Sequence, residues 1–72
     1  MSKYDWYNVP KEVKWIAADA DGWQTRHSAK PSIKGDVWLD CTCSGYLSIF
    51  RPSKNEYKGC WQYSLEEHPN VD

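Results

Sequence analysis

The Asp21-Gly22 pair is the feature that most constrains how this chain can fold. It lies between two runs of strand-like composition, residues 15–20 and 23–28. Asp-Gly between such runs is a strong signal for a hairpin with a two-residue type I′ turn. A two-residue loop would pair Ala20 with Trp23 and Ala17 with Arg26. Arg26 would then share one face with Trp15 and Asp19, and the opposite face would carry Ile16, Ala18, Ala20, Trp23, Thr25 and His27.

The rest of the chain predicts further strands and two short helical turns. Residues 29–36 contain Pro31 and Gly35 and are expected to form a loop. Residues 37–42 and 46–51 have strand-like composition around a Ser44-Gly45 turn. Helical turns are expected at 10–14 and at 61–67, which precede Pro69. We therefore expect one domain, residues 1–72, with a small α+β, mostly β fold. Its antiparallel sheet would have three to four strands, with short helical turns near both ends.

Aromatic side chains dominate the apolar composition. The 72 residues include five tryptophans, five tyrosines and one phenylalanine, which together outnumber Ile, Leu and Val. Tryptophan and tyrosine carry a polar group and favour places with one apolar and one polar side. Chains this short bury only about 60% of the surface that the unfolded form exposes. Dense aromatic packing or self-association would add stability, so we expect a homo-oligomer.

Charge and hydropathy argue against two classes of partner. The formal net charge is −1 and both signs are mixed along the chain. A sequence-specific nucleic-acid partner would require a basic stripe, which is absent. The sequence has no apolar run near 18 residues and no recognisable signal peptide, so we expect no membrane partner.

The three cysteines, Cys41, Cys43 and Cys60, could hold zinc together with His27 or His68. Zinc sites use spacers of two to four residues between cysteines, and the single Thr42 does not fit. An odd number of cysteines favours reduced thiols that pack as small apolar side chains. The Asp19-x-Asp21-Gly22 run also fails as a calcium loop, because Ala17 and Ser28 replace the required ligands. No metal or other cofactor is expected.

Catalytic motifs are also missing. A nucleophile needs a base and a group that orients the base. Cys41 or Cys43 with His27 or His68 could supply the first two, but no flanking motif supports this. The carboxylates Asp19, Asp21, Asp36 and Asp40 lie in or near expected turns, where Asp is common. We expect a binding protein and not an enzyme.

Rings and cations on the expected hairpins favour a nucleotide ligand. Aromatic side chains stack on bases with about 1–3 kcal/mol per base, and Arg binds phosphate through its planar fork. The same rings could instead form the core of a small sheet. They could also cover a partner protein, because Trp, Tyr and Arg dominate protein interfaces. In the nucleotide hypothesis, bases stack on Trp23, Trp38 and Tyr46, phosphate binds Arg26 and Lys30, and Asp19 or Asp21 accepts a hydrogen bond from a base edge.

Several short elements occur in an order that resembles a known family. They are Tyr4-Asp5-Trp6, Val9-Pro10, Trp15-Ile16-Ala17, Asp19-x-Asp21-Gly22, Lys30-Pro31 and Trp61-x-x-Ser64-Leu65-Glu66-x-x-Pro69. In this order they resemble a widespread set of small proteins of tailed bacteriophages, most of which have no assigned function. The match extends over nearly the whole chain. Residues 24–29 and the run Cys41-Thr42-Cys43 depart from the commoner pattern.

This resemblance implies a viral protein that acts in the cytoplasm of the infected bacterial host. It suggests immune evasion of the anti-CBASS type, in which a small oligomeric sponge sequesters a cyclic dinucleotide signal without cleaving it. The alternative is a phage protein that inhibits a host protein by covering its surface. A third possibility is a structural accessory protein of the virion.

Overall fold

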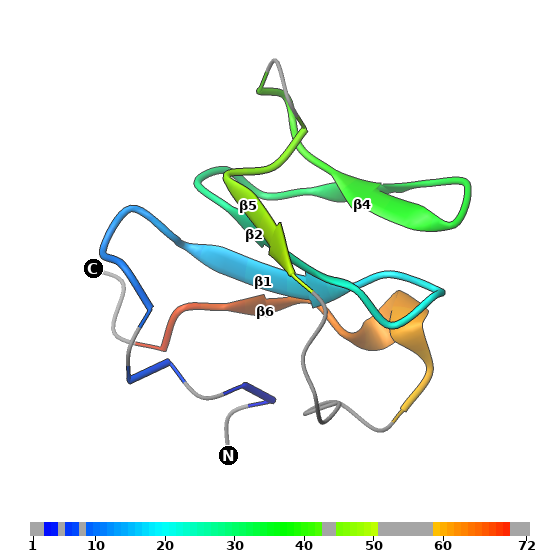
Figure 1. Cartoon of the computed structure of the whole chain (residues 1–72), viewed down its shortest axis with the longest axis horizontal. Helices are drawn as coiled ribbons and strands as arrows, with labels where there is room; N and C mark the ends of the chain where they lie inside the picture. Colours follow the sequence, from blue (N-terminus) through cyan, green and yellow to red (C-terminus); the bar gives the residue numbers. More distant parts are fainter. Residues whose placement is uncertain (1–2, 5, 8, 43–44, 51–58, 70–72) are drawn as a thin grey trace.

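In a computed structural model of the protein, residues 3–4, 6–7, 9–42, 45–50 and 59–69 are described (Figure 1). These residues form six short strands and one 3-10 helix. The elements are β1 (Trp15–Ala18), β2 (Gln24–His27), β3 (Ser32–Lys34), β4 (Val37–Leu39), β5 (Ser48–Phe50), η1 (Trp61–Tyr63) and β6 (Glu66–Glu67).

The strands form two antiparallel sheets. One has four strands in the order β5-β2-β1-β6, and the other is the two-stranded hairpin β3-β4. The expected mostly β fold is therefore confirmed. Near the N-terminus, the expected helical turn is a single hydrogen-bonded turn, in which the Val13 N–H donates to the Pro10 carbonyl at 3.1 Å. At the other end, η1 is followed by β6, a strand that the sequence did not indicate.

The β1–β2 hairpin lies where Asp21-Gly22 predicts it, but the predicted register is wrong. Ala17 pairs with Thr25 and Ala18 with Gln24. The Asp19 N–H donates to the Trp23 carbonyl at 2.8 Å, so the loop has three residues, 20–22. Gly22 closes this loop with a φ of 92°. A tight turn followed by a glycine with positive φ is the usual form of a three-residue hairpin loop.

This shift by one residue reverses the predicted faces, because strand side chains alternate. Thr25 and His27 lie opposite Ala17 and Trp15, respectively, and share their face. Arg26 lies opposite Ile16 on the other face. The predicted grouping of Arg26 with Trp15 is therefore wrong.

The partners of the later strands also differ from expectation. Residues 32–34, expected in a loop, form β3 and pair with β4 through a two-residue turn at Gly35-Asp36. Gly35 has a φ of 64° at the first turn position, which suits a type II′ hairpin turn. This local pairing occupies β4, and β5 pairs with β2 instead. A tight turn joins neighbours at a low entropic cost, whereas composition alone cannot show which strands pair.

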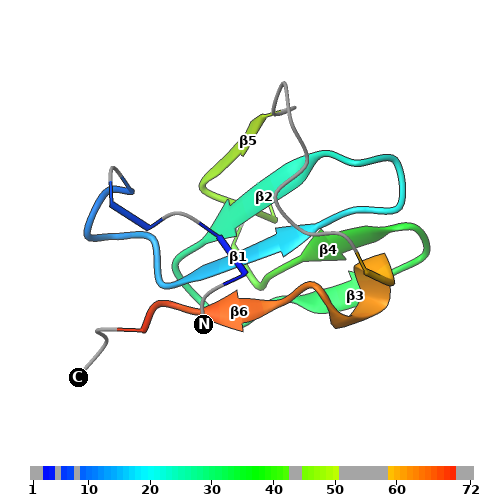
Figure 2. The ribbon, with the colours of Figure 1, turned by 90° about the horizontal axis from the view of Figure 1, so that it is seen from below.

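The four-stranded sheet is covered on both faces (Figures 1 and 2). Tyr4, Trp6 and Val13 pack with Ile16 to form the apolar core on one face. The β3-β4 hairpin lies across the other face, where β4 contacts β1. Strand β5 is an edge strand of the sheet.

Polar side chains join the N-terminal segment to the C-terminal one, an arrangement that we call the terminal clamp. The Tyr4 hydroxyl donates to the Ser64 carbonyl at 2.7 Å, and the Trp6 Nε1–H donates to Glu66 Oε1 at 2.6 Å. Lys3 donates through its backbone N–H to Glu66 and through Nζ to the Leu65 carbonyl, both at 2.9 Å. These hydrogen bonds join residues 3–6 to residues 64–66 and stabilise the fold.

Candidate functional site

A buried polar trio lies between the four-stranded sheet and the β3-β4 hairpin. His27 contacts Asp40 through Nδ1 and Oδ2 at 2.8 Å and Thr25 through Nε2 and Oγ1 at 2.7 Å. Thr25 and His27 come from β2, two residues apart on one face, and Asp40 directly follows β4. The second oxygen of Asp40 accepts the Thr42 N–H at 2.8 Å.

Burial and hydrogen bonding set the protonation of this trio. Burial lowers the pKa of His27, and the neighbouring Asp40 carboxylate only partly opposes this effect. Burial also raises the pKa of Asp40, but the hydrogen bonds from Thr42 and His27 together outweigh burial and leave it below its ordinary value. At neutral pH the Nδ1–H of His27 therefore donates to a carboxylate, and Nε2 accepts the Thr25 hydroxyl.

The order hydroxyl, imidazole, carboxylate matches that of a catalytic triad. Thr25 is 1% exposed and the side chains of His27 and Asp40 are 0% exposed, so no substrate reaches the hydroxyl in this structure. The trio ties the segment after β4 to the sheet. Sequence reasoning treated Asp40 as a turn residue, and no local pattern links it to His27.

The residues weighed for a cysteine or metal site lie apart. Cys41 and Cys60 are exposed free thiols, and Cys43 lies outside the described residues. The His68 ring lies 4.7 Å from the ring of Trp6 in the terminal clamp. Within the part of the chain that the structure describes, no three His, Cys, Asp or Glu side chains are placed to hold a metal ion.

Two of the predicted ligand residues, Asp19 and Trp38, are engaged with each other. Both are buried, and Asp19 Oδ1 accepts the Trp38 N–H at 2.8 Å. Burial raises the pKa of Asp19, partly offset by this hydrogen bond, and nearby Asp21 raises it further. The Trp38 indole N–H donates to the Trp61 carbonyl at 3.3 Å. These contacts attach one end of β4 to the β1–β2 turn.

Asp21 and Trp23 lie at the same turn and remain more accessible. Asp21 is exposed and accepts the Trp23 N–H at 3.3 Å, while Trp23 is half-buried. Asp36, in the turn of the β3-β4 hairpin, is exposed as well, and its carbonyl accepts the Ala20 N–H at 3.1 Å. The two exposed carboxylates make this end unfavourable for a phosphate group.

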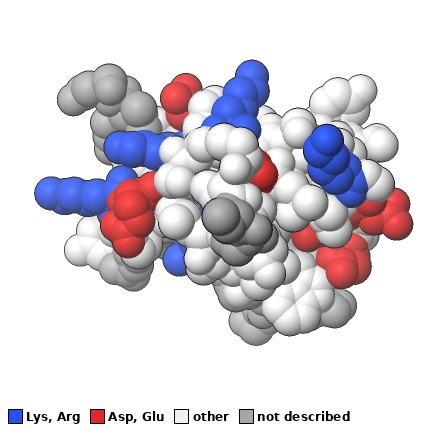
Figure 3. All heavy atoms as spheres, turned by 90° about the horizontal axis from the view of Figure 1, so that it is seen from above, with Lys and Arg blue, Asp and Glu red and all other residues white. Residues whose placement is uncertain are grey.

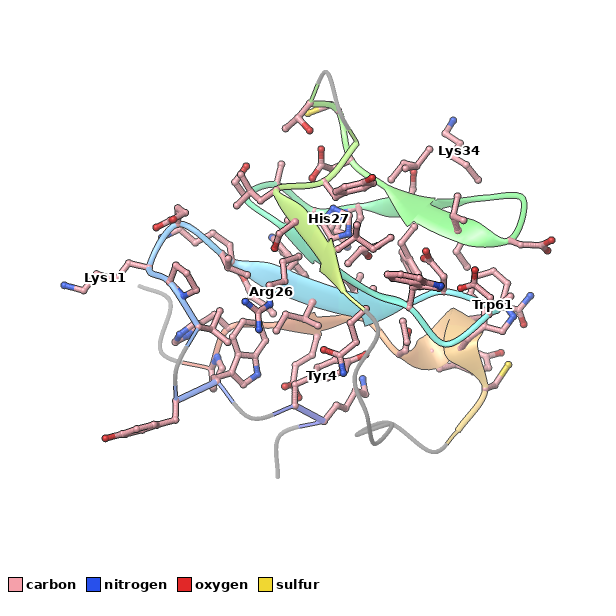
Figure 4. All side chains as sticks on the ribbon, viewed as in Figure 1. Tyr4, Lys11, Arg26, His27, Lys34 and Trp61 are labelled. Carbon is pink, nitrogen blue, oxygen red and sulfur yellow. The ribbon has the colours of Figure 1, made fainter. Side chains whose placement is uncertain are left out.

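Lys30 and Trp15 lie at the opposite end, where β1 begins and β2 has ended. Lys30 is exposed, and its Nζ lies 5.8 Å from the centre of the half-buried Trp15 ring. Lys14, next to Trp15, is exposed too. In Figure 3, Lys and Arg predominate toward the left end, where Figure 4 places Lys11, and carboxylates predominate toward the right end.

Arg26 and Tyr46 are separate from both ends. In Figure 4, Arg26 lies on the sheet face that carries Tyr4. His27 lies on the other face, toward β4. Both Arg26 and Tyr46 are half-buried, and Tyr46 follows Gly45 on the way to β5. The seven predicted ligand residues thus do not converge on one site.

Comparisons with protein-family models, with curated proteins and with solved structures found no match for this chain. Among the described residues, no helix is long and apolar enough to cross a membrane.

Proposed function

We propose that this protein binds and sequesters a nucleotide, namely a cyclic dinucleotide immune signal in the cytoplasm of a phage-infected bacterium, without cleaving it. The observation that carries the proposal is the pairing of Lys30 with the Trp15 ring, which are 5.8 Å apart at the surface. An indole face can stack on a base, and the Lys30 head group, which lies over the ring, can move aside to bind the adjoining phosphate.

The charge distribution supports this end of the molecule over the β1–β2 turn. Lys14 and Lys30 are exposed near Trp15, and one carboxylate, Glu67, is exposed directly opposite Trp15 on β6. At the opposite end, Asp21 and Asp36 are exposed together with one cation, Lys34. A phosphate diester carries a negative charge and is attracted to the first end and repelled by the second. Trp15 and Lys30 are thus the first candidates for ligand contact, and the contacts predicted for Trp23, Tyr46, Arg26 and Asp21 stay predictions.

Self-association completes the proposal. Lys30 is exposed and Trp15 only half-buried, so one copy leaves a ligand on this surface open to water. Tight small-molecule sites enclose most of the ligand surface. A second copy that closes over the Trp15 face would provide this enclosure, and native mass spectrometry with and without the ligand would detect it.

A thermal-shift titration against cyclic and linear nucleotides tests the proposal. A ligand that binds only the folded state stabilises it by about 2.7 kcal/mol at a hundredfold excess over the dissociation constant. The expected result is a large shift with one cyclic dinucleotide and little with its linear form. No shift across the panel would contradict the proposal.

Two matched lysine variants locate the site. Lys30→Ala should weaken binding, because it removes the cation beside Trp15. Lys34→Ala removes another exposed lysine from the other end of the molecule, where Figure 4 labels it, and should leave binding unchanged. Equal effects of the two variants would place the ligand elsewhere.

A second candidate function is inhibition of a host protein by surface contact. The observation that favours it is the exposure of Leu47 (44%) and Ile49 (38%), at and beside the edge strand β5. Edge strands can add a strand from a partner, with pockets or side chains giving specificity. Co-purification of one host protein with the wild type in a stoichiometric complex, and its loss in an Ile49→Lys variant, would favour this function.

A further inference from the structure

The β3-β4 hairpin is attached to the four-stranded sheet by buried polar groups at both ends of β4. At one end, Asp19 accepts the Trp38 N–H at 2.8 Å. At the other end, Asp40 contacts His27 at 2.8 Å. A small side chain, Ala17, lies on this face of β1 beneath the hairpin. The hairpin thus depends on titratable groups as well as on apolar packing.

The Asp40 end is a compact loop whose link to the sheet passes through His27. The Asp40 N–H donates to the Gly45 carbonyl at 2.7 Å, and the Gly45 N–H donates to the Thr42 carbonyl at 3.1 Å. Both partners of each bond lie within the loop, so these bonds do not connect it to the sheet. The Asp40–His27 contact joins it to β2, and the Leu47 N–H reaches the Arg26 carbonyl at 2.6 Å where the chain enters β5.

A second proton on His27 disturbs this arrangement. Nε2 faces the Thr25 hydroxyl, which must then become the acceptor and turn its own proton toward the Ala17 carbonyl. That oxygen lies 3.4 Å from Thr25 Oγ1, longer than the usual 2.5–3.0 Å of such a bond. The imidazolium would also occupy a position that is 0% exposed. Both effects disfavour the charged form in the closed structure.

Among the residues that the structure describes, His27 has one charged neighbour, Asp40, and a hydrogen bond to the Gly45 backbone, both of which favour the protonated ring and only partly offset burial. From β1, Trp15 lies directly opposite and does not titrate, and from β5 the nearest strand positions are Ser48 and Ile49. The Asp40 carboxylate comes from the segment after β4. Lys14, whose backbone N–H donates to the His27 carbonyl, has an exposed side chain, and the neighbouring Arg26 lies on the opposite face.

We propose that uptake of a proton by His27 in mild acid releases the β3-β4 hairpin and the following loop from the four-stranded sheet, while the sheet and the terminal clamp remain folded. The clamp contacts the opposite face through Tyr4 and Trp6 and contains no part of the trio. Release exposes His27 to water, where its charged form is stable. It also exposes Thr25 beside the imidazole.

Proton linkage gives the direction in which pH changes the stability of the closed hairpin. The pKa of His27 is lower in the closed structure than the 6.5 of an unperturbed imidazole, so the open form takes up the proton first. Closure is therefore weakened as pH falls below about 6.5, and the open population rises by up to about tenfold per pH unit until the closed form is protonated as well. Protonation of Asp19 has the opposite effect on closure: because the pKa of Asp19 is raised in the closed structure, its protonation strengthens closure as pH falls. This effect occurs closer to pH 3.8, the ordinary value of the carboxyl group.

Amide hydrogen exchange of the wild type between about pH 7 and 5 tests the proposal. After correction for the intrinsic pH dependence of exchange, the amides of β4 should lose protection while those of β1 keep it. The midpoint should coincide with that of the His27 imidazole, followed by nitrogen-15 chemical shifts. Unchanged protection of β4, or simultaneous loss of protection in β1 and β4, would overturn the proposal.

A histidine variant separates this effect from general acid sensitivity. His27→Gln keeps an N–H donor for Asp40 and does not titrate, so the pH response of β4 should disappear. His68→Gln removes the other histidine, beside Trp6, and should respond as the wild type does. If the β4 amides of His27→Gln lose protection in acid to the same extent as those of the wild type, the proposal is overturned. If that variant does not fold, the wild-type midpoints decide.

Discussion

Replacement of Ser64 by alanine tests how strongly one hydroxyl joins the C-terminal segment to the central strand. Ser64 is 0% exposed, and its Oγ accepts the Ala18 N–H at 2.8 Å. The same hydroxyl can donate to the carbonyl of Trp61 at 2.6 Å or of Ala18 at 3.0 Å. Pairing of β1 with β6 ends at Ile16, so Ser64 supplies the partner that a longer β6 would give to Ala18.

The expected loss follows from the groups left behind. An orphaned buried N–H costs about 1–3 kcal/mol, and loss of the donated hydrogen bond adds about 1 kcal/mol. Ser64→Ala should therefore lower the free energy of unfolding by about 2–4 kcal/mol. At about 0.05–0.15 kcal/mol per residue, a chain of this length has only some 4–11 kcal/mol in total. The variant should lose a large part of its stability.

Urea unfolding followed by tryptophan fluorescence measures this loss. Ser32→Ala provides the control, because Ser32 is an exposed serine in β3. Its free energy of unfolding should stay within about 0.5 kcal/mol of the wild type. The reasoning is refuted if Ser64→Ala stays within the same range, or if both variants lose equal stability.

Two further pairs of substitutions test the turns and the buried carboxylate. Gly45→Ala should destabilise the protein more than Gly22→Ala. Both glycines have a positive φ, so both substitutions strain the backbone. In addition, a Cβ at Gly45 would lie 2.7 Å from Leu39 Cδ2, whereas a Cβ at Gly22 meets nothing within 4 Å. Thermal unfolding of the two variants gives the comparison, and a reversed order would contradict the structure. Asp19→Asn keeps an oxygen for the Trp38 N–H and removes a buried charge, so its stability at neutral pH should equal or exceed that of the wild type. Asp19→Ala should lose about 1–3 kcal/mol in urea unfolding. Because the pKa of Asp19 is raised, any advantage of the Asn variant should shrink as pH falls.

The sequence was most informative where structure is local. Asp21-Gly22 located the first hairpin, and the strand-like runs located β4 and β5. The length of the hairpin loop escaped prediction, because Ala20 and Asp19 also bond to Asp36 and Trp38, residues far along the chain. Such contacts favour one register over its neighbour by interactions that a local pattern does not contain.

The candidate site was harder to predict for the same reason. Trp38 and Trp23 look alike in sequence, yet Trp38 is buried and Trp23 only half-buried. Two of the other rings, Tyr7 and Tyr63, are 89% and 74% exposed. Which rings those would be depends on the layer that covers each sheet face. That layer is set by non-local pairing.

The terminal clamp has a consequence for the order of events during synthesis. Tyr4 and Trp6 belong to the core, but their hydrogen-bond partners lie 60 residues later in the sequence. In a chain growing from its N-terminus, these two rings cannot form their hydrogen bonds to Ser64 and Glu66 until those residues have left the ribosome. The β1–β2 hairpin can form early because its contacts are local, whereas closure of the core must wait. Until then the nascent chain presents large aromatic side chains to chaperones and to other chains.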